Sequence, residues 1–263
     1  MLKQRVLTAI VALIVLAVVL FVVPMPVARA IIALILLSGA WEWGGLIAAG
    51  GTASRVGFTA VVAASMIAIF MLLSNPEVLD ILLKTALAWW LVALLWMFFF
   101  PTPIPLPLVW ICGILVLVPA WAALDYLYRL DAQLLLFSLL IVWIADIGAY
   151  FVGKGFGRVK LAPKISPGKS WEGVLGGLTA VLLLAAVGNH YLGTEISVLV
   201  PLCLAVSMLS IVGDLTVSMF KRNAGVKDSG SVFPGHGGVL DRIDSVSAAV
   251  PLFALALGWV GLQ

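Results

Sequence analysis

Long apolar runs separated by short polar breaks recur along the whole chain, and this pattern restricts its possible folds more than any other feature. A hydrocarbon layer about 30 Å thick is crossed by about 20 apolar residues in a helix, and only helices or closed barrels satisfy their backbone there. The runs have the length of helices and therefore predict transmembrane helices. We expect nine spans, at 6–23, 28–49, 56–73, 85–100, 108–124, 133–151, 173–192, 196–219 and 246–262.

Composition excludes the main alternatives to a membrane protein. Of the 263 residues, 63% are hydrophobic and 10% are charged, whereas ordinary soluble domains carry about 25% charged residues. A water-soluble globule and a disordered chain are therefore excluded. The first run follows Lys3 and Arg5 like a secretory signal, but it is longer than the usual signal core of about 7–15 residues and further runs follow it, so we expect a retained anchor.

The basic residues are distributed unevenly between the two sides of the predicted membrane domain. Of the 15 Lys and Arg residues, only Arg29, Lys84 and Arg129 fall on one side. Because basic residues in short loops are retained in the cytoplasm, this bias predicts an N-terminus inside and a C-terminus outside. The fold class that follows is an all-α polytopic integral membrane protein with about nine transmembrane helices and two polar cytoplasmic loops.

Ionisable residues concentrate in two glycine-rich loops on the inner side, 152–172 and 220–245, whereas the connector 101–107 carries no charge. We divide the chain into 1–132, with about five transmembrane helices, and 133–263, a catalytic region with about four spans and both polar loops. Any chemistry is expected in these loops.

The first loop contains two imitations of phosphate-binding motifs. Gly-x-Gly-x-Gly at 153–157 follows no predicted strand, and Gly168-Lys169-Ser170 lacks the earlier glycine of a P-loop because Pro163 stands there. The segment 166–170 nevertheless precedes a predicted helix, whose free N–H groups, with hydroxyls and ammonium groups, favour an anion. The candidates for holding a substrate phosphate are Lys164, Ser166, Lys169 and Ser170, with Glu172 fixing Lys169. The alternative is a basic loop that contacts anionic lipid headgroups.

In the second loop, Asp214, Ser218, Lys221 and Arg222 share one stripe of a helix that continues from the eighth run. Asp241 and Asp244 share one face of the next helix. A carboxylate within an apolar run is expensive unless it is paired or functional. Asp214 therefore either pairs structurally with Lys221 or Arg222, or shares a Mg²⁺ ion with Asp241, since Mg²⁺ takes carboxylate oxygens and substrate phosphates.

Glycines surround the histidine of the second loop, in the sequence Gly235-His236-Gly237-Gly238. Glycine lets the backbone approach a ligand closely. His236 either caps a turn or contacts substrate, and its position beside two aspartates favours contact with substrate.

The stretch from Ser218 to Asp244 resembles the signature of the phosphatidate cytidylyltransferases at every defined position. The matching residues are Ser218, Phe220, Lys221-Arg222, Lys227-Asp228, Gly230, Phe233-Pro234, His236-Gly237-Gly238, Val239, Asp241-Arg242 and Asp244. The segment 166–173 and the upstream Asp146-x-x-Ala149-Tyr150 are also similar to this family. The resemblance covers about the C-terminal half of the chain.

The resemblance implies an enzyme that converts CTP and phosphatidate into CDP-diacylglycerol and pyrophosphate. It implies Mg²⁺, with a monovalent cation such as K⁺ as a second cofactor, a homodimer surrounded by membrane lipids, and no nucleic-acid partner. It places the enzyme in the bacterial cytoplasmic (inner) membrane with its active site on the cytoplasmic side. Asp214 and Asp241 correspond to the metal-binding aspartates of the family.

Roles for the remaining residues follow from this chemistry. Asp244 would orient Arg242 or a metal-bound water. The residues expected to act in catalysis are Lys221, Arg222, Lys227, His236, Arg242 and Asp244. The residues expected to bind substrate are Lys164, Ser166, Lys169, Ser170, Glu172, Ser218, Asp228, Gly237 and Gly238.

Two other functions are alternatives to this one. An ion-coupled transporter would use Glu42, Asp146 and Asp214 as intramembrane relays, but it leaves the polar loops without a purpose. An alcohol phosphotransferase that consumes CDP-lipids would carry its last two aspartates four residues apart, whereas Asp241 and Asp244 are three apart.

Overall fold

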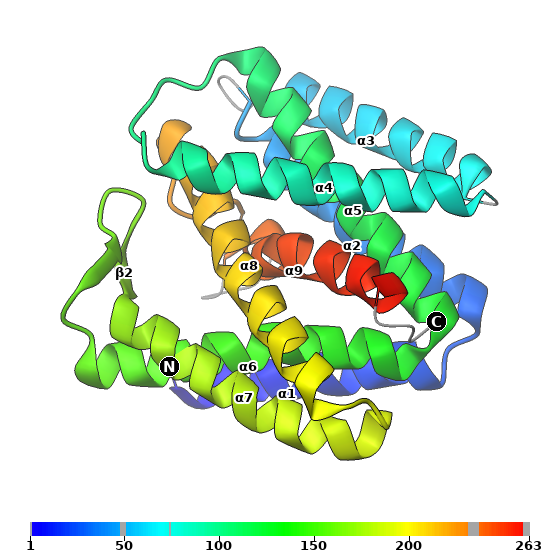
Figure 1. The fold of residues 1–263 in the computed structure, drawn as a ribbon. Helices are drawn as coiled ribbons and strands as arrows, with labels where there is room; N and C mark the ends of the chain where they lie inside the picture. The colour runs from blue at the N-terminus through cyan, green and yellow to red at the C-terminus, as the bar shows by residue number, and fades with distance from the viewer. Residues whose placement is uncertain (1, 48–50, 74, 231–236, 260–263) are drawn as a thin grey trace.

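The computed structural model describes the chain except for residues 1, 48–50, 74, 231–236 and 260–263, and its described part is largely helical (Figure 1). The helices are α1 (Leu2–Phe21), α2 (Met25–Gly44), α3 (Thr52–Leu72), α4 (Pro76–Met97), α5 (Leu106–Leu130), α6 (Ala132–Phe156), α7 (Trp171–Leu192), α8 (Ile196–Asn223) and α9 (Leu240–Trp259). Each predicted apolar run overlaps one of these helices. The helix ends differ from the predicted ends by at most six residues, except that α4 begins nine residues before the predicted start at 85.

Seven of the helices in the described part, α2 to α8, are long and apolar enough to cross a membrane. This supports a polytopic membrane protein. The helices α1 and α9 are not in that group, so the predicted count of nine spans is not confirmed.

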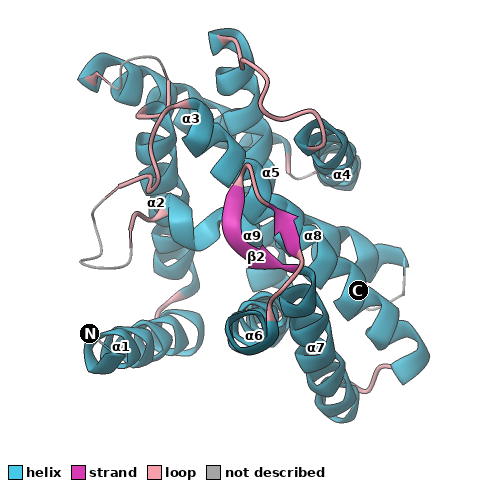
Figure 2. Cartoon of the chain, turned by 90° about the vertical axis from the view of Figure 1, so that its left-hand side faces the viewer, coloured by secondary structure: helices cyan, strands magenta, loops and turns pink. Residues whose placement is uncertain are grey.

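The expectation of an all-α chain is wrong in one detail, because the loop between α6 and α7 forms a β-hairpin. Strand β1 (Lys160–Ala162) pairs antiparallel with β2 (Ser166–Ser170), and Lys160 lies opposite Ser170. A turn at 163–165 reverses the chain between them. The hairpin satisfies backbone groups that a loop would leave to water, and it lies near the middle of the view in Figure 2.

Helix α9 lies in the middle of the bundle (Figure 1), packed against α8, α5, α4, α6 and α2. Its residues from Ile243 to Leu257 are nearly all buried, and Ala248, Ala249 and Val250 are fully buried. A helix that is buried all round needs apolar residues on every face beyond its polar first turn. The buried part of α9 therefore fixes the position of its first turn.

The hairpin, the connector before α5 and the end of α8 meet at one end of the bundle. There, Arg222 at the end of α8 donates to the carbonyl of Ile165 in the hairpin at 3.1 Å, and the Ile104 N–H donates to the Asn223 side chain at 3.2 Å. At the other end, Asp125 near the end of α5 pairs with Arg29 at 2.6 Å and with Arg129 at 3.1 Å. This agrees with the predicted sorting of basic residues between two sides.

Candidate active site

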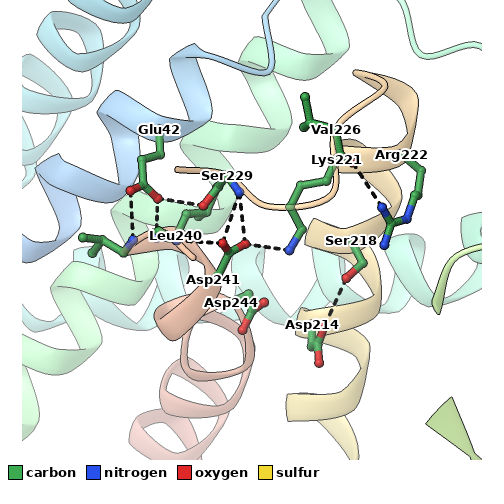
Figure 3. Close-up of polar contacts among 12 residues, drawn as sticks. Glu42, Asp214, Ser218, Lys221, Arg222, Val226, Ser229, Leu240, Asp241 and Asp244 are labelled. Atoms are coloured by element: carbon green, nitrogen blue, oxygen red, sulfur yellow. Dashed lines mark hydrogen bonds and ion pairs between the residues drawn. The ribbon is translucent and has the colours of Figure 1, made fainter. Parts of the chain in front are cut away.

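The last turns of α8 and the first turn of α9 bring the predicted polar residues together (Figure 3). The hydroxyl of Ser218 donates to Asp214 at 3.1 Å. One helical turn further on, the ammonium group of Lys221 donates to Asp241 of α9 at 2.7 Å. The predicted stripe on α8 is thus present over these residues, and Lys221 connects it to α9.

Asp241 is held from three directions. Its carboxylate accepts from Lys221 at 2.7 Å, from the Gly238 N–H at 2.9 Å and from the Ser229 N–H at 3.1 Å. Burial raises the pKa of Asp241, but Lys221 and the two N–H groups outweigh it, so this pKa lies below its usual value. Gly237 has φ +80°, and a Cβ there would lie 2.5 Å from Asp241, so the turn requires glycine. Asp241 is therefore an oriented carboxylate at neutral pH.

Asp214 pairs with Lys169 of β2, whereas the sequence suggested Lys221 or Arg222 as its structural partner, as the alternative to a Mg²⁺ ion shared with Asp241. The hairpin, which the sequence did not predict, carries Lys169 to α8. Burial lowers the pKa of Lys169, but the Asp214 carboxylate raises it more, so the pKa lies above its usual value and the amine stays charged. The two polar loops therefore contribute to the same site.

Two further carboxylates lie within electrostatic reach of Asp214. They are Asp146 on α6 and Asp244 on α9, of which Asp244 is 7% exposed. The pattern around Asp146 resembles the family, yet the sequence assigned Asp146 no role in the enzyme. Side chains from α6, α8, α9 and β2 thus converge on one acidic and basic cluster.

The predicted role of Glu172 is wrong. Its carboxylate accepts from the backbone N–H groups of Arg158 and Val159, both at 3.1 Å, instead of fixing Lys169. The Ser170 hydroxyl accepts from the Gly173 N–H at 3.2 Å and so caps α7. Both residues position the hairpin on its helix.

The remaining candidates of the first loop and of α8 are Lys164, Ser166 and Arg222. Lys164 is exposed in the turn of the hairpin, and Ser166 opens β2. Arg222 donates to the carbonyls of Ile165 and Val226, which ties the hairpin to the end of α8.

The segment after α8 carries the exposed pair Lys227 and Asp228, and Arg242 is exposed in the first turn of α9. His236 lies outside the described residues. The structure places Lys227, Asp228 and Arg242 at the same end of the molecule as the aspartates.

Sequence reasoning missed Glu42 at the end of α2 as part of this arrangement. Its buried carboxylate accepts from the Ser229 hydroxyl at 2.7 Å and from the Val239 and Leu240 N–H groups at 2.9 and 2.8 Å. The available signal was an acidic residue between Trp41 and Trp43 within an apolar run.

Within the described ranges, no group of three or more His, Cys, Asp or Glu side chains is arranged to hold a metal ion by itself. Mg²⁺ does not require such a group, because it is usually bound by one or two carboxylates together with substrate phosphates and water. Asp214 and Asp241 are each paired with a lysine whose place a cation can take. The two aspartates therefore fit that requirement.

Comparison with known proteins identifies the family. Residues 3–260 match the model of the cytidylyltransferase family. The phosphatidate cytidylyltransferase of Pseudomonas aeruginosa is 42% identical over 98% of this chain and 99% of its own length. The protein of the same name from Haemophilus influenzae is 45% identical over 67% of this chain and 68% of its own length. The chain therefore belongs to the cytidylyltransferase family and is a nucleotidyltransferase of the phosphatidate cytidylyltransferase type.

Proposed function

We propose that the chain transfers the cytidylyl group of CTP to phosphatidate and releases CDP-diacylglycerol and pyrophosphate, by direct attack of one substrate on the other at the cluster between α8 and α9. The observation that carries this site is the convergence of Asp214, Lys221 and Asp241 from two helices. The assignment of the reaction is supported by the match of residues 3–260 to the cytidylyltransferase family.

The reaction requires no nucleophile from the protein. A phosphate oxygen of phosphatidate, ionised near neutral pH, attacks the α-phosphorus of CTP. The bond to the new oxygen forms as the bond between the α-phosphorus and its bridging oxygen to the β-phosphate breaks, and pyrophosphate leaves with that electron pair. Catalysis of such a step consists of positioning and neutralisation of charge.

Asp214 and Asp241 are the residues that would hold Mg²⁺. When bound, Mg²⁺ supplies positive charge that offsets the negative charge of the two substrates' phosphates. The lysines now on these aspartates, Lys169 and Lys221, are flexible ammonium groups. They are therefore available to phosphate oxygens when the carboxylates bind a cation.

The basic residues around the aspartates divide between the two substrates. Lys221, Arg222, Lys227 and Arg242 would stabilise the departing pyrophosphate. Lys164, Ser166 and Lys169 would hold the other phosphate, with Ser170 and Glu172 supporting the hairpin that carries them. Asp244, buried beside Asp214, would orient Arg242. This division is supported by the placement of these residues at one end of the bundle.

The bacterial cytoplasmic membrane, a cytoplasmic site, a homodimer and a supporting monovalent cation such as K⁺ belong to the same proposal. The cytoplasmic site is supported by the charge bias, since Arg29 and Arg129 lie at the end opposite to the polar loops. Phosphatidate would enter from the inner leaflet and CTP from the cytosol.

The test is an assay of purified protein in detergent with phosphatidate, Mg²⁺ and CTP labelled at the α-phosphate. Label from α-labelled CTP is expected in a lipid product, and label from γ-labelled CTP in pyrophosphate. Incorporation from the γ-label, or no incorporation at all, would contradict the proposal. Nucleotide-independent ion flux in proteoliposomes would instead support the transporter.

A further inference from the structure

We propose that Glu42 is a positioning residue of the enzyme. It holds Ser229 and the start of α9 so that Asp241 and Lys221 keep the positions that the transfer reaction requires. The inference rests on the proposed function, and it concerns a residue outside the stretch from Ser218 to Asp244. Glu42 acts through Ser229, Val239 and Leu240, whose hydroxyl and backbone N–H groups donate to its carboxylate.

The carboxylate of Glu42 is bound by donors from two places in the sequence, Ser229 and the adjacent pair Val239 and Leu240, which begins ten residues later. Oε2 accepts from the Ser229 hydroxyl at 2.7 Å and from the Leu240 N–H at 2.8 Å, and Oε1 accepts from the Val239 N–H at 2.9 Å. With 3% of its surface exposed, this charged group is satisfied by protein donors instead of water. It therefore fastens both ends of the segment 229–240 to α2.

The Val239 and Leu240 N–H groups belong to the N-terminus of α9, which has no intrahelical acceptors for them. A carboxylate is favoured at such a terminus by the helix dipole as well as by the hydrogen bonds. Glu42 thus serves as a cap supplied by a helix 198 positions away in the sequence. The cap fixes the direction in which the first turn of α9 projects Asp241.

The backbone around the carboxylate is shaped to receive it. A Cβ atom at Gly230 or at Gly238 would overlap the Glu42 carboxylate, so both glycines leave room that no other residue would leave. The next residue along, Trp43, donates its indole N–H to the Val109 carbonyl at 2.9 Å, and its ring contacts that of Phe220 of α8 in a tilted arrangement with the centroids 5.0 Å apart. The end of α2 therefore contacts α5 and α8, and these contacts fix the position of Glu42.

The contacts continue from Glu42 to the site. Ser229, whose hydroxyl binds Glu42, donates its N–H to Asp241 at 3.1 Å, and Asp241 accepts from Lys221 at 2.7 Å. Figure 3 shows this series from Glu42 through Ser229 and Asp241 to Lys221. Loss of the Glu42 carboxylate would release the start of α9, and a displacement of about 1 Å at a reacting centre costs about 100-fold in rate.

The test compares E42Q with E77Q, which makes the same chemical change at an exposed residue in the first turn of α4. In E42Q an amide N–H₂ faces N–H and O–H donors, so at least one hydrogen bond is lost. We expect kcat per folded molecule to fall about tenfold or more, with KM for phosphatidate within about threefold of wild type, because a residue that positions the catalytic groups affects turnover more than substrate binding. E77Q is expected to behave as wild type.

Two further readouts separate positioning from general stability. Amide hydrogen exchange of the peptide covering 237–245 needs no substrate, and it is expected to become faster in E42Q while peptides of α6 are unchanged. S229A is expected to lower kcat in the wild-type background and to have a smaller effect in E42Q, because both changes break the same contact.

Unchanged exchange at 237–245, or normal kcat per folded E42Q molecule, would overturn the proposal. So would fully additive effects of S229A and E42Q. A wild-type protein that incorporates no label would contradict the proposed function instead, and the exchange experiment would still decide whether Glu42 holds the start of α9.

Discussion

Each of the two aspartates proposed to hold Mg²⁺ is paired with a lysine. Lys169 pairs with Asp214 and Lys221 pairs with Asp241. Because the ammonium group balances a carboxylate in a partly buried position, removing it leaves a charge without its partner, which costs more than the pair itself contributes. At the scale of single residues, the site is therefore a set of matched charges.

The Lys169 ammonium group is expected to matter for turnover. K169M keeps most of the apolar stem but removes the charge that faces Asp214, so kcat should fall by about 100-fold or more. The matched control is K84M, since Lys84 forms an exposed pair with Asp80 at 2.6 Å, and such surface pairs contribute about 0–1 kcal/mol. Steady-state assays with labelled CTP compare the two, and equal turnover in K169M and wild type would refute the role of Lys169.

Most residues that the structure brings together in the cluster were singled out from the sequence, but several of their partners could not be predicted. Helical spacing sufficed for the approach of Ser218 to Asp214, because both lie on one element. The pairing of Lys169 with Asp214 and the binding of Glu172 to backbone N–H groups depend on a hairpin whose register only tertiary structure defines. Glu42 was missed because its donors lie almost 200 positions away.

At the scale of elements, the pairing of α6 with α7 holds the hairpin between them. Their contact is lined with glycines that allow the two backbones to approach: a Cβ at Gly177 would lie 2.6 Å from the Ala145 carbonyl oxygen, and one at Gly148 would lie 2.8 Å from that of Gly176. Small residues at such contacts are typical of helices that pack in membranes. The position of Lys169 therefore depends on this packing.

Substitution of Gly177 should separate these helices. G177A places a methyl group against a backbone oxygen that cannot rotate away, so we expect a loss of about 1–3 kcal/mol in unfolding free energy. G155A is the control in α6, because a Cβ there meets nothing within 4 Å, and replacing glycine within a helix contributes up to about 1 kcal/mol of stability. Thermal unfolding in detergent measures both variants. Equal stability of the two would contradict the close packing of α6 and α7.

The elements themselves were largely predictable from the sequence. Run length predicted helices at all nine positions where the described residues form them, because backbone satisfaction in an apolar layer leaves few other solutions. The hairpin at 160–170 was not predicted, since its strands are too short to show a pattern. The buried position of α9 depends on its packing against five other helices.

At the scale of the whole molecule, charges are sorted between two ends of the bundle. The end opposite to the site contains Asp125, which is 2% exposed and bound by Arg29 and Arg129. Both arginines come from helix ends, α2 and α5. This cluster holds the bundle together at a distance from the proposed chemistry.

Removal of the Asp125 charge should destabilise the protein without altering its chemistry. D125N leaves two arginines beside a buried amide. Because the two arginine side chains are 26% and 36% exposed, we expect a loss of about 1–3 kcal/mol, which is less than the cost of breaking a fully buried pair. We expect a lower unfolding temperature and normal kcat per folded molecule, whereas D80N, in an exposed pair, should change neither. A fall in kcat per folded D125N molecule would show that the two ends are coupled.

Orientation in the membrane can be tested with exposed residues at the two ends, Glu77 in the first turn of α4 and Lys160 in the hairpin. E77C is expected to react with a membrane-impermeant maleimide added to intact cells, and K160C only after the membrane is opened. Cys112 and Cys203 are buried, so they should give little background. The opposite labelling pattern would place the site outside and refute the charge-bias argument.

The central claim is that Asp214 of α8 and Asp241 of α9 hold one divalent cation between them. The most direct test is anomalous diffraction from crystals of the full chain soaked with Mn²⁺ and CTP, for wild type and D241N. In wild type we expect one Mn²⁺ peak within about 2–2.5 Å of an oxygen of each aspartate, in the range of oxygen coordination to such ions. In D241N we expect a weakened peak. A peak that touches neither aspartate, or one that D241N leaves unchanged, would contradict it.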